Sequence, residues 1–537
     1  MKARKIFVIA ISLVSSILSV GCSSHQTKKT HEKPVKQEAS MRIRGMVKML
    51  DTVKGIDQNS IQINQNVFEG LYRYDKEGRL VLAGAESEKT EDGGRVHVYR
   101  LRKDAKWSNG DPVVAQDYVY AWKKLLSLND SASNWTNLLI LKNAEEIHDG
   151  QKDMESLGVQ ALDDHTLIGN TPYYKEIFAS TAMFPQNHAV AEKYGDEYGK
   201  TSASTVFNGP FSVVGLEQGS KKWELVKNKN YWGKKDVKLK RIKYVVERDQ
   251  PSAQKDFFKG KCDYVRIGCS YDEKLASKKG FHKRLIPEVS MIRFNQKRQV
   301  TGNVHFRRAV TYAIDRKKIA ASKTFHAKAL YGIVPANYSY SPENDVDYRE
   351  DAGNIVGLDK KKAQNEWKQA QKETGRNQVT LTLMFTENSR YSDISGKIKK
   401  DLETTLPGLQ IKIKMVELNE KMEQAFDYDY DMFYLSWQPS YVDPLAFIVN
   451  GGMEHLREDH HNPDYRNNLE KANACGGDFG KRRGFIIAAE KDLVEKDAFV
   501  APLFQQANGY LLNPNLRCVG FVPYGSTCIL RDAWIRK

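Results

Sequence analysis

The chain has 537 residues, of which 40% are hydrophobic and 28% charged, and its formal net charge is +16. This length exceeds what one ordinary hydrophobic core serves and indicates about two to four domains. Beyond residue 22 no apolar run approaches the roughly 20 residues that a membrane-spanning helix needs, so we expect the bulk of the chain to be soluble.

The first 22 residues have the composition of a secretory signal. Three basic residues precede an apolar stretch over 6–20, and Gly21 stands directly before Cys22. The arrangement resembles the lipobox of bacterial lipoproteins, although Ser19 occupies a place where that motif usually has Leu. It implies a lipoprotein signal over 1–22 and a lipidated Cys22 that anchors the protein at the outer face of the cytoplasmic membrane. The alternative is a plain signal peptide with a chance Cys.

The next segment, residues 23–40, is polar and lacks apolar periodicity. Such a segment buries too little surface to order itself, so we predict a flexible tether. Removal of residues 1–21 takes away three positive charges and leaves a net charge of +13 on the mature chain.

Strand and helix patterns alternate through the rest of the chain. Ser108 to Asp111 is a turn signal, and the segment 115–126 has helical periodicity with Tyr118, Trp122 and Leu125 on one face. Further periodicities predict strands over 158–168, 211–214, 223–227, 240–247, 289–295, 379–385, 409–416 and 430–437, and helices over 251–259, 305–321, 359–373, 392–404 and 483–496. The fold class is therefore α/β with mixed sheets flanked by helices.

The positive charge is dispersed along the chain. Its densest stretch runs from Lys221 to Lys243 and is interleaved with Trp223 and Trp232, as in some nucleic-acid platforms. It carries no RNP-like or glycine-clamp motif, so we predict a solvated surface and no nucleic-acid partner.

One long motif gives the chain a family resemblance. The segment Leu101 to Trp122 closely resembles the signature of oligopeptide-binding proteins, the solute-binding subunits of Opp-type ABC transporters. Further blocks follow in the same order, nearly spanning residues 46–530: Phe68-Glu69-Gly70-Leu71, Ala161 to Leu167, Asn208 to Phe211 with Lys229 to Trp232, Arg307 to Arg316, Trp437 to Pro444 and Ala501 to Phe504.

The resemblance implies a periplasmic-binding-protein-like, two-lobe Venus flytrap with an additional inserted domain. The expected bounds are 41–74, 185–290 and 502–537 for the first lobe, 75–184 for the inserted domain and 291–501 for the second lobe. The chain would cross between the lobes near Ile292 and near Pro502. It implies a monomer that captures short peptides between the lobes and delivers them to ABC transporter permease subunits.

The same resemblance implies the ligand-binding residues. Ser436 and Gln438 would offer backbone groups and Trp437 an aromatic wall. Ser440 stands where the family usually has the Asp that pairs with the α-amine of the peptide, so a neighbouring acid such as Asp443 substitutes for it or the ligand lacks a free amine. Asp443 is equally a turn or capping residue before a proline. Trp135 is a weaker candidate, since it could equally pack inside the inserted domain. The segment 46–51 also lacks an acid that the family commonly has upstream of its Leu-Asp pair.

Two other substrate interpretations stay open. Metal–chelate binding would suit the acidic and histidine side chains gathered over 454–461, although their spacing matches no standard metal site. A receptor for peptide signals without a transport role is the other. We predict no enzyme, because HExxH, GxSxG and phosphate-loop motifs are missing, and Met432 replaces the glycine that a calcium loop starting at Asp427 would need.

The cysteines predict no metal site and no cofactor. Five remain after Cys22, no CxxC pair occurs, and the number is odd. Cys518 and Cys528 could close a C-terminal hairpin as a disulfide, or all five could be free thiols.

Overall fold

The computed structural model describes residues 35–537 except 56, 129–134, 172–182, 270, 323–325, 342, 389, 440–441, 451–461, 476–477 and 523–527. Residues Gln37–Lys537 form one compact unit. The predicted signal segment with Cys22 lies outside the described residues, as does most of the predicted tether. The sheet begins at Glu38, so the last three residues of the predicted tether belong to its first strand, in which Ala39 and Met41 are buried.

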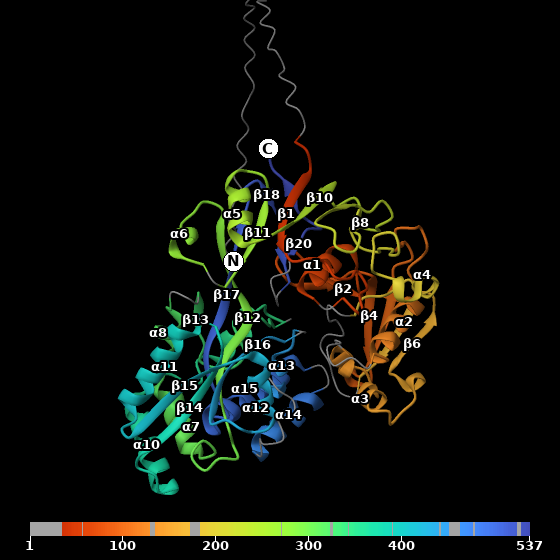
Figure 1. The fold of residues 1–537 in the computed structure, drawn as a ribbon. Helices are drawn as coiled ribbons and strands as arrows, with labels where there is room; N and C mark the ends of the chain where they lie inside the picture. The colour runs from red at the N-terminus through yellow and green to blue at the C-terminus, as the bar shows by residue number, and fades with distance from the viewer. Residues whose placement is uncertain are drawn as a thin grey trace, which may run out of the picture. The chain divides into compact units, whose positions relative to one another are not determined.

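The centre of the unit is an 11-stranded mixed sheet in the order β15-β14-β16-β12-β17-β11-β1-β10-β9-β8, with β13 beside β17. Two long antiparallel strands, β12 (Phe281–Phe294) and β17 (Val500–Leu512), lie side by side in its middle (Figure 1). The C-terminal part of β12 contains β-branched and aromatic residues, which favour strands, and most residues of β17 are buried. β12 pairs with β16 on one side of the sheet and β17 pairs with β11 on the other, so the two strands connect the two halves of the sheet.

The first half of the sheet contains three parallel neighbours, β11 (Tyr264–Gly268), β1 (Glu38–Arg44) and β10 (Arg241–Glu247). Two antiparallel strands extend it, β9 (Lys222–Lys227) and β8 (Phe211–Val214). Parallel neighbours need a crossover, and α5 (Gln250–Phe258) connects β10 to β11. The helix α1 (Gln58–Val67) follows β1, with the Asp57 carboxylate accepting from the amides of Asn59 and Ser60 at its start.

The second half contains β14 (Val379–Thr386), parallel to both β15 (Leu409–Val416) and β16 (Met432–Trp437). Helices cover it: α7 (Val304–Ala313), α8 (Arg316–Ala320), α10 (Lys360–Thr374), α11 (Tyr391–Thr405), α12 (Leu418–Phe426), α13 (Pro444–Asn450), α14 (Pro463–Ala474) and α15 (Phe479–Lys491). The single helix predicted over 305–321 is wrong. Ile314 is extended (φ −85°, ψ 121°), and the Asp315 carboxylate starts a second helix by accepting from the Lys318 amide.

A separate four-stranded antiparallel sheet, in the order β4-β5-β7-β6, lies within the segment predicted as the inserted domain. Its strands are β4 (Ala85–Glu91), β5 (Val96–Leu101), β6 (Val159–Asp163) and β7 (Thr166–Asn170), and α2 (Ala115–Leu126) packs beside them. The single strand predicted over 158–168 is wrong because it is a hairpin. The Asp163 carboxylate accepts from the His165 amide and the Thr166 hydroxyl, each at 2.8 Å, and this closes the turn.

The remaining elements are short. They are the strands β2 (Tyr72–Tyr74), β3 (Leu80–Leu82), β13 (Ala327–Ala329), β18 (Leu516–Arg517), β19 (Gly520–Phe521), β20 (Cys528–Ile529) and β21 (Trp534–Ile535), the helices α3 (Ala144–His148), α4 (His188–Tyr194), α6 (Glu273–Ala276) and α9 (Tyr348–Ala352), and the short helical segments η1 (Asp92–Gly94), η2 (Trp135–Ile140), η3 (Met154–Ser156), η4 (Gly195–Glu197) and η6 (Asp492–Lys496). None of the helices formed by the described residues has both the length and the apolar character needed to cross a membrane.

The motif residues of the sequence meet inside the fold. Glu69 is buried and accepts hydrogen bonds from the Tyr231 hydroxyl at 2.5 Å and from the Trp232 indole, while Asn208 bonds the Glu69 backbone at both its amide and its carbonyl. Asp117 accepts from the Trp107 indole at 2.9 Å. The Glu69 contacts therefore hold together segments that are more than 100 residues apart in the chain, whereas the bond between Trp107 and Asp117 is local, and the conspicuous residue types of these motifs serve the fold.

Candidate functional site

The ladder between β12 and β17 breaks where the two strands pass through the middle of the sheet. Its register shifts between Leu285 and Val289 and again after Ser290. Pro287 has no amide hydrogen to donate, so the ladder cannot continue through it. The Gln505 side chain instead donates to the backbone carbonyl oxygen of Ile286 at 3.2 Å. This irregular segment is where the two halves of the sheet meet.

A polar cluster lies directly beside the break, at the crossing of β12, β16 and β17. The hydroxyls of Ser290 and Ser436 are 2.9 Å apart, and the Tyr434 hydroxyl is 2.7 Å from the first and 3.0 Å from the second. The Gln506 amide donates to Ser436 at 3.0 Å and to the Glu288 carboxylate at 2.6 Å. The Ser436 side chain is thus engaged within the protein, and along one edge its backbone pairs with Ser290 of β12.

Glu288 is the carboxylate of this cluster. Burial raises its pKa, while Arg390, Gln506 and Arg266 act in the opposite direction. No motif singled out Glu288 or Gln506, because a carboxylate or amide in a strand pattern is usually solvent-exposed. Only the break in the ladder, which brings both side chains inward, identifies them.

Trp437 ends β16, and Gln438 follows it. The Trp437 ring is half-buried and packs edge to face on Phe447 of α13, with ring centroids 5.2 Å apart and an interplanar angle of 86°. Gln438 is also half-buried. Ser440, where the sequence departs most from the resemblance, lies outside the described residues.

The Asp443 side chain is 6% exposed and fully engaged. Its carboxylate accepts from the Arg482 guanidinium at 2.7 Å and from the Leu445 amide at 2.9 Å, which is the geometry of a residue capping α13. Its backbone amide also donates to the Tyr338 hydroxyl at 3.2 Å. Of the two roles that the sequence left open, this arrangement favours capping.

Trp135 starts η2 in the segment that carries the four-stranded sheet. Its ring stacks on His148 of α3 at 3.6 Å with an interplanar angle of 14°, and it packs against the core shared by the first half of the main sheet and the four-stranded sheet. This contact favours the second interpretation of Trp135, in which the aromatic side chain packs within the segment that carries the four-stranded sheet.

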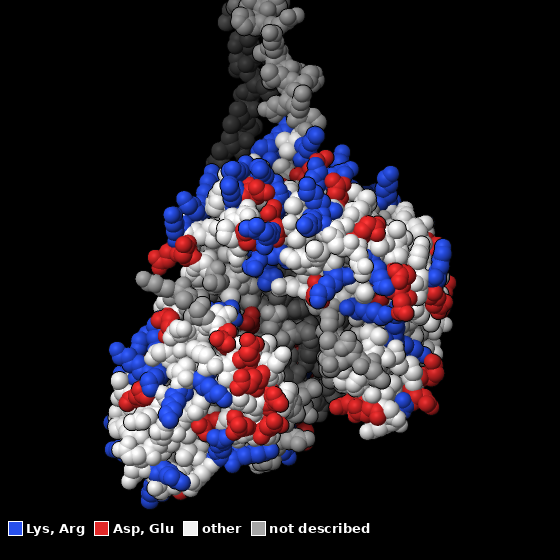
Figure 2. All heavy atoms as spheres, in the orientation of Figure 1, with Lys and Arg blue, Asp and Glu red and all other residues white. Residues whose placement is uncertain are grey.

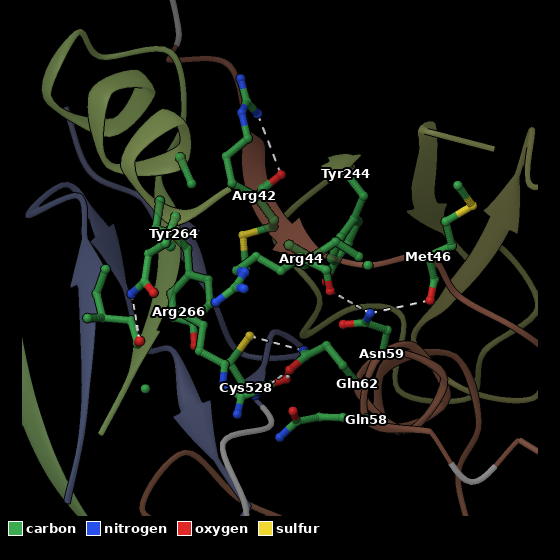
Figure 3. A pocket seen from close by; sticks show the side chains of 18 of the residues that line it. Arg42, Arg44, Met46, Gln58, Asn59, Gln62, Tyr244, Tyr264, Arg266 and Cys528 are labelled. Atoms are coloured by element: carbon green, nitrogen blue, oxygen red, sulfur yellow. Dashed lines mark hydrogen bonds between the residues drawn. The ribbon is translucent and has the colours of Figure 1, made fainter. Parts of the chain in front are cut away.

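A cavity of about 740 Å³ opens at the carboxyl ends of the parallel strands β1 and β11 (Figure 3). Arg44 comes from the end of β1 and Arg266 from β11, with Gln58 and Gln62 of α1 on the facing wall. Carboxyl ends of parallel strands are the usual place for ligands in α/β sheets. Cys269 at the rim accepts a hydrogen bond from the Arg390 guanidinium at 3.2 Å, so the cavity borders the other half of the sheet.

The described part of the chain contains no group of three or more His, Cys, Asp or Glu side chains that is arranged to hold a metal ion. The acidic and histidine residues over 454–461 lie outside it. The cysteines from Cys262 onward are free thiols, including Cys518 and the buried Cys528, whose pKa burial raises to about 12. Of the two states left open for that pair, the structure has the thiols.

Known proteins resemble the chain over nearly its whole length. Residues 79–452 match the family described as "Bacterial extracellular solute-binding proteins, family 5 Middle". The "Dipeptide-binding protein" of Lactococcus lactis subsp. cremoris (strain MG1363) is 27% identical over 100% of both chains. The "Oligopeptide-binding protein OppA" of Bacillus subtilis (strain 168) is 26% identical over 98% of this chain and 99% of its own.

Solved structures agree with this similarity. "Listeria monocytogenes OppA bound to peptide" superposes with a TM-score of 0.71 at 30% identity and covers 94% of this chain and 99% of its own. The expected fold class, a periplasmic-binding-protein-like α/β fold with mixed sheets flanked by helices, is confirmed. The chain belongs to the bacterial extracellular solute-binding proteins of family 5.

Proposed function

We propose that this protein is the extracellular substrate-binding subunit of an ABC importer, and that it captures short peptides and delivers them to the permease. The observation that carries the proposal is the polar cluster of Glu288, Ser290, Tyr434, Ser436 and Gln506 at the break in the β12–β17 ladder. It joins the strand end that carries Trp437 to the place where the two halves of the sheet meet. Relatives named for dipeptide and oligopeptide binding match the chain from end to end.

The proposed domains follow the expected bounds. The first lobe comprises 41–74, 185–290 and 502–537, the inserted domain 75–184 and the second lobe 291–501. Two large apolar clusters support the two-lobe arrangement, since one draws its residues from 289–504 and the other from both ends of the chain. Residues of the inserted segment, including Trp107 and Trp122, belong to the second cluster, so the inserted domain would move with the first lobe.

An extended peptide consists mainly of backbone, so a binder that tolerates many sequences must satisfy backbone amides and carbonyls. Along one edge of β16 Ser436 and Trp437 pair with β12, whereas the pairing with β14 on the other edge is given only for Met432 and Phe433, so this second edge at Ser436 to Gln438 suits the purpose. In this proposal Trp437 forms an aromatic wall of the site, Ser440 is a further ligand-binding residue, and Asp443 fixes the start of α13 through Arg482. The function needs no catalysis and no cofactor.

The remaining parts of the proposal concern location. A lipid anchor on Cys22 with a tether over 23–40 would hold a monomer at the outer face of the cytoplasmic membrane. Metabolic labelling with a palmitate analogue tests the anchor, with Cys22→Ser as the control. Labelling that persists in the variant would contradict it.

Peptide binding is tested on residues 23–537 after unfolding and refolding to remove carried-over ligand. A pool of short peptides at about 100 times the dissociation constant is expected to stabilise the protein by about 2.7 kcal/mol in a thermal-shift assay. An N-acetylated pool shows whether a free amine is recognised. Stabilisation by metal chelates in place of peptides would overturn the proposal in favour of a metal–chelate binder.

Trp437→Ala is the site-directed test. Buried aromatic side chains at binding sites commonly contribute about 2 kcal/mol or more, so the affinity for peptides is expected to fall roughly 30-fold. Trp437→Phe is the matched control, because it keeps an aromatic ring against Phe447. Peptide affinity that is unchanged in the alanine variant would remove Trp437 from the site.

A further inference from the structure

The lining of the cavity at the ends of β1 and β11 is strongly positive. Four arginines and one lysine line it, against one carboxylate, that of Asp57. That carboxylate accepts from the amides of Asn59 and Ser60 and from the Ser60 hydroxyl at the start of α1. It is therefore already committed to capping a helix.

Two of the five cations have partners within the protein. Arg42 forms ion pairs of 3.1 Å with both Glu247 and Asp256, and Arg248 pairs with Asp249 at 3.5 Å. The side chains of the other three, Arg44, Lys48 and Arg266, form no hydrogen bond or ion pair with any described residue. The cavity thus holds three positive charges for which the described part of the chain supplies no counter-ion at contact distance.

The three side chains differ in exposure. Arg44 and Lys48 are exposed, whereas Arg266 is half-buried. Burial lowers the pKa of Arg266, Arg44 lowers it further, and Glu288 acts in the opposite direction. The Glu288 carboxylate is itself hydrogen-bonded by Gln506. Like charges held together at the end of a sheet repel one another, and a bound anion would relieve this repulsion.

The surface view agrees with this charge distribution. Figure 2 shows Lys and Arg gathered on the part of this face that carries α5, β1 and β10, above a hollow in the surface. Figure 3 shows Arg44 and Arg266 on the walls of the cavity, from β1 and β11 respectively. The cavity volume of about 740 Å³ is within the usual range for small-ligand sites.

We infer that this cavity receives a carboxylate of the bound peptide, held by Arg44, Lys48 and Arg266, so that the protein selects acidic peptides. The inference rests on the proposed peptide-binding function and names its substrate class. Guanidinium groups bind carboxylates through paired, charge-assisted hydrogen bonds, which are stronger than neutral ones. A peptide amine placed among the same three cations would be repelled.

The preference is measured by calorimetry on residues 23–537, which contain the whole compact unit, after removal of carried-over ligand. The probes are tetraalanine peptides with a single Glu, Gln or Lys scanned through every position. At one or more positions Glu is expected to bind about 10-fold more tightly than Gln, and Lys more weakly than Gln. The Glu preference is expected to shrink at high salt, because exposed charges are screened.

The variants Arg44→Ser and Arg266→Met are each expected to remove most of the Glu preference, which is measured for each variant as the ratio of its affinities for the Glu and the Gln peptide. Lys240→Ser is the matched control. It removes the same charge from an exposed side chain just before β10, at the opposite end of the parallel strands, and is expected to keep the preference. Because Arg44 is exposed, its replacement tests the inference even if the Arg266 variant fails to fold.

The outcomes separate the two claims. If none of the peptides binds, the proposed function fails. If Glu, Gln and Lys peptides bind equally, or if the Glu preference survives both arginine replacements, peptide binding stands and the inference is overturned. Inorganic phosphate is a separate probe. If it binds at this cavity while Glu peptides bind no more tightly than Gln peptides, the cavity binds phosphate and the carboxylate assignment is wrong.

Discussion

Buried ionic groups in the second half of the sheet are paired with protein atoms. Arg316 is buried, its pKa is lowered to about 10 by burial, and it donates to the backbone carbonyls of Pro502 at 2.7 Å and Thr311 at 3.0 Å. Arg482 and Asp443 pair with each other at 2.7 Å. Because an unpaired buried charge costs several kcal/mol, these pairs are requirements of the fold. Among the cations around the cavity, the half-buried Arg266 is the contrasting case.

Lys421 carries a prediction about pH. It is 4% exposed, its ammonium donates to the Tyr434 carbonyl at 2.7 Å, and burial lowers its pKa from 10.5 to about 8. Below about pH 8 the folded and unfolded states both bind the proton. Between there and 10.5 only the unfolded state does, so rising pH favours the folded state, by about 3 kcal/mol at most.

The comparison is with Lys421→Met, which keeps the length of the side chain without the titrating group. The thermal midpoint of the wild-type protein is expected to rise relative to this variant as the pH increases through that window. Lys412→Met, an exposed lysine on β15, is the control and should show a constant difference. A constant difference for Lys421→Met as well would contradict the assignment.

At the scale of elements, capping groups and one proline set the boundaries. The helix predicted over 305–321 is divided because the Asp315 carboxylate bonds the Lys318 amide and the Asp315 amide in turn donates to Asp401, both at 3.1 Å. Periodicity alone does not detect such a division, since buried residues continue on both sides of it. Pro287 breaks the ladder of β12 for a comparable local reason, the loss of a donor.

Asp315→Ala tests the cap of α8. Loss of an N-cap side chain commonly costs about 1 kcal/mol, so the free energy of unfolding of the cooperative unit that contains α8 is expected to fall by that amount. Lys317→Ala, an exposed residue of the same helix, is the control and should change it by less than about 0.5 kcal/mol. Chemical denaturation measures both, and equal effects would show that the cap does not set this boundary.

At the scale of the whole unit, the two large apolar clusters are joined through β12 and β17. The break in the ladder at Ile286 to Glu288 lies between the two clusters. Because few hydrogen bonds join β12 to β17 there, the strands can bend at this point without losing many of them. We therefore expect these residues to act as the hinge when a peptide binds. This position is a few residues before Ile292, where the resemblance put the crossing.

Hinge closure is measured by small-angle scattering and amide hydrogen exchange. A bound peptide is expected to reduce the radius of gyration and to slow exchange at 286–290 and 505–508, because closure excludes water from the irregular ladder. Exchange in β14, inside one cluster, is expected to stay unchanged. Equal protection of β14 would indicate general stabilisation in place of closure.

The sequence by itself determined the class of fold, the family and most elements. Its local periodicities located strands such as 211–214 and 409–416, and its collinear motifs identified the solute-binding family. These properties are local or depend on residue types at fixed spacing, so they can be predicted from the sequence alone. The resemblance also predicted the candidate loop at Ser436 to Gln438, and this stays a prediction.

Only the tertiary structure decided which residues meet. Met41 pairs in register with Tyr244 on one side and Tyr264 on the other, and this pairing brings Arg44 and Arg266 to one cavity. The same long-range pairing brings Glu288 to Gln506 and commits Asp443 to Arg482. Contacts between residues so far apart in the chain depend on the packing of the whole sheet, and no local pattern encodes them.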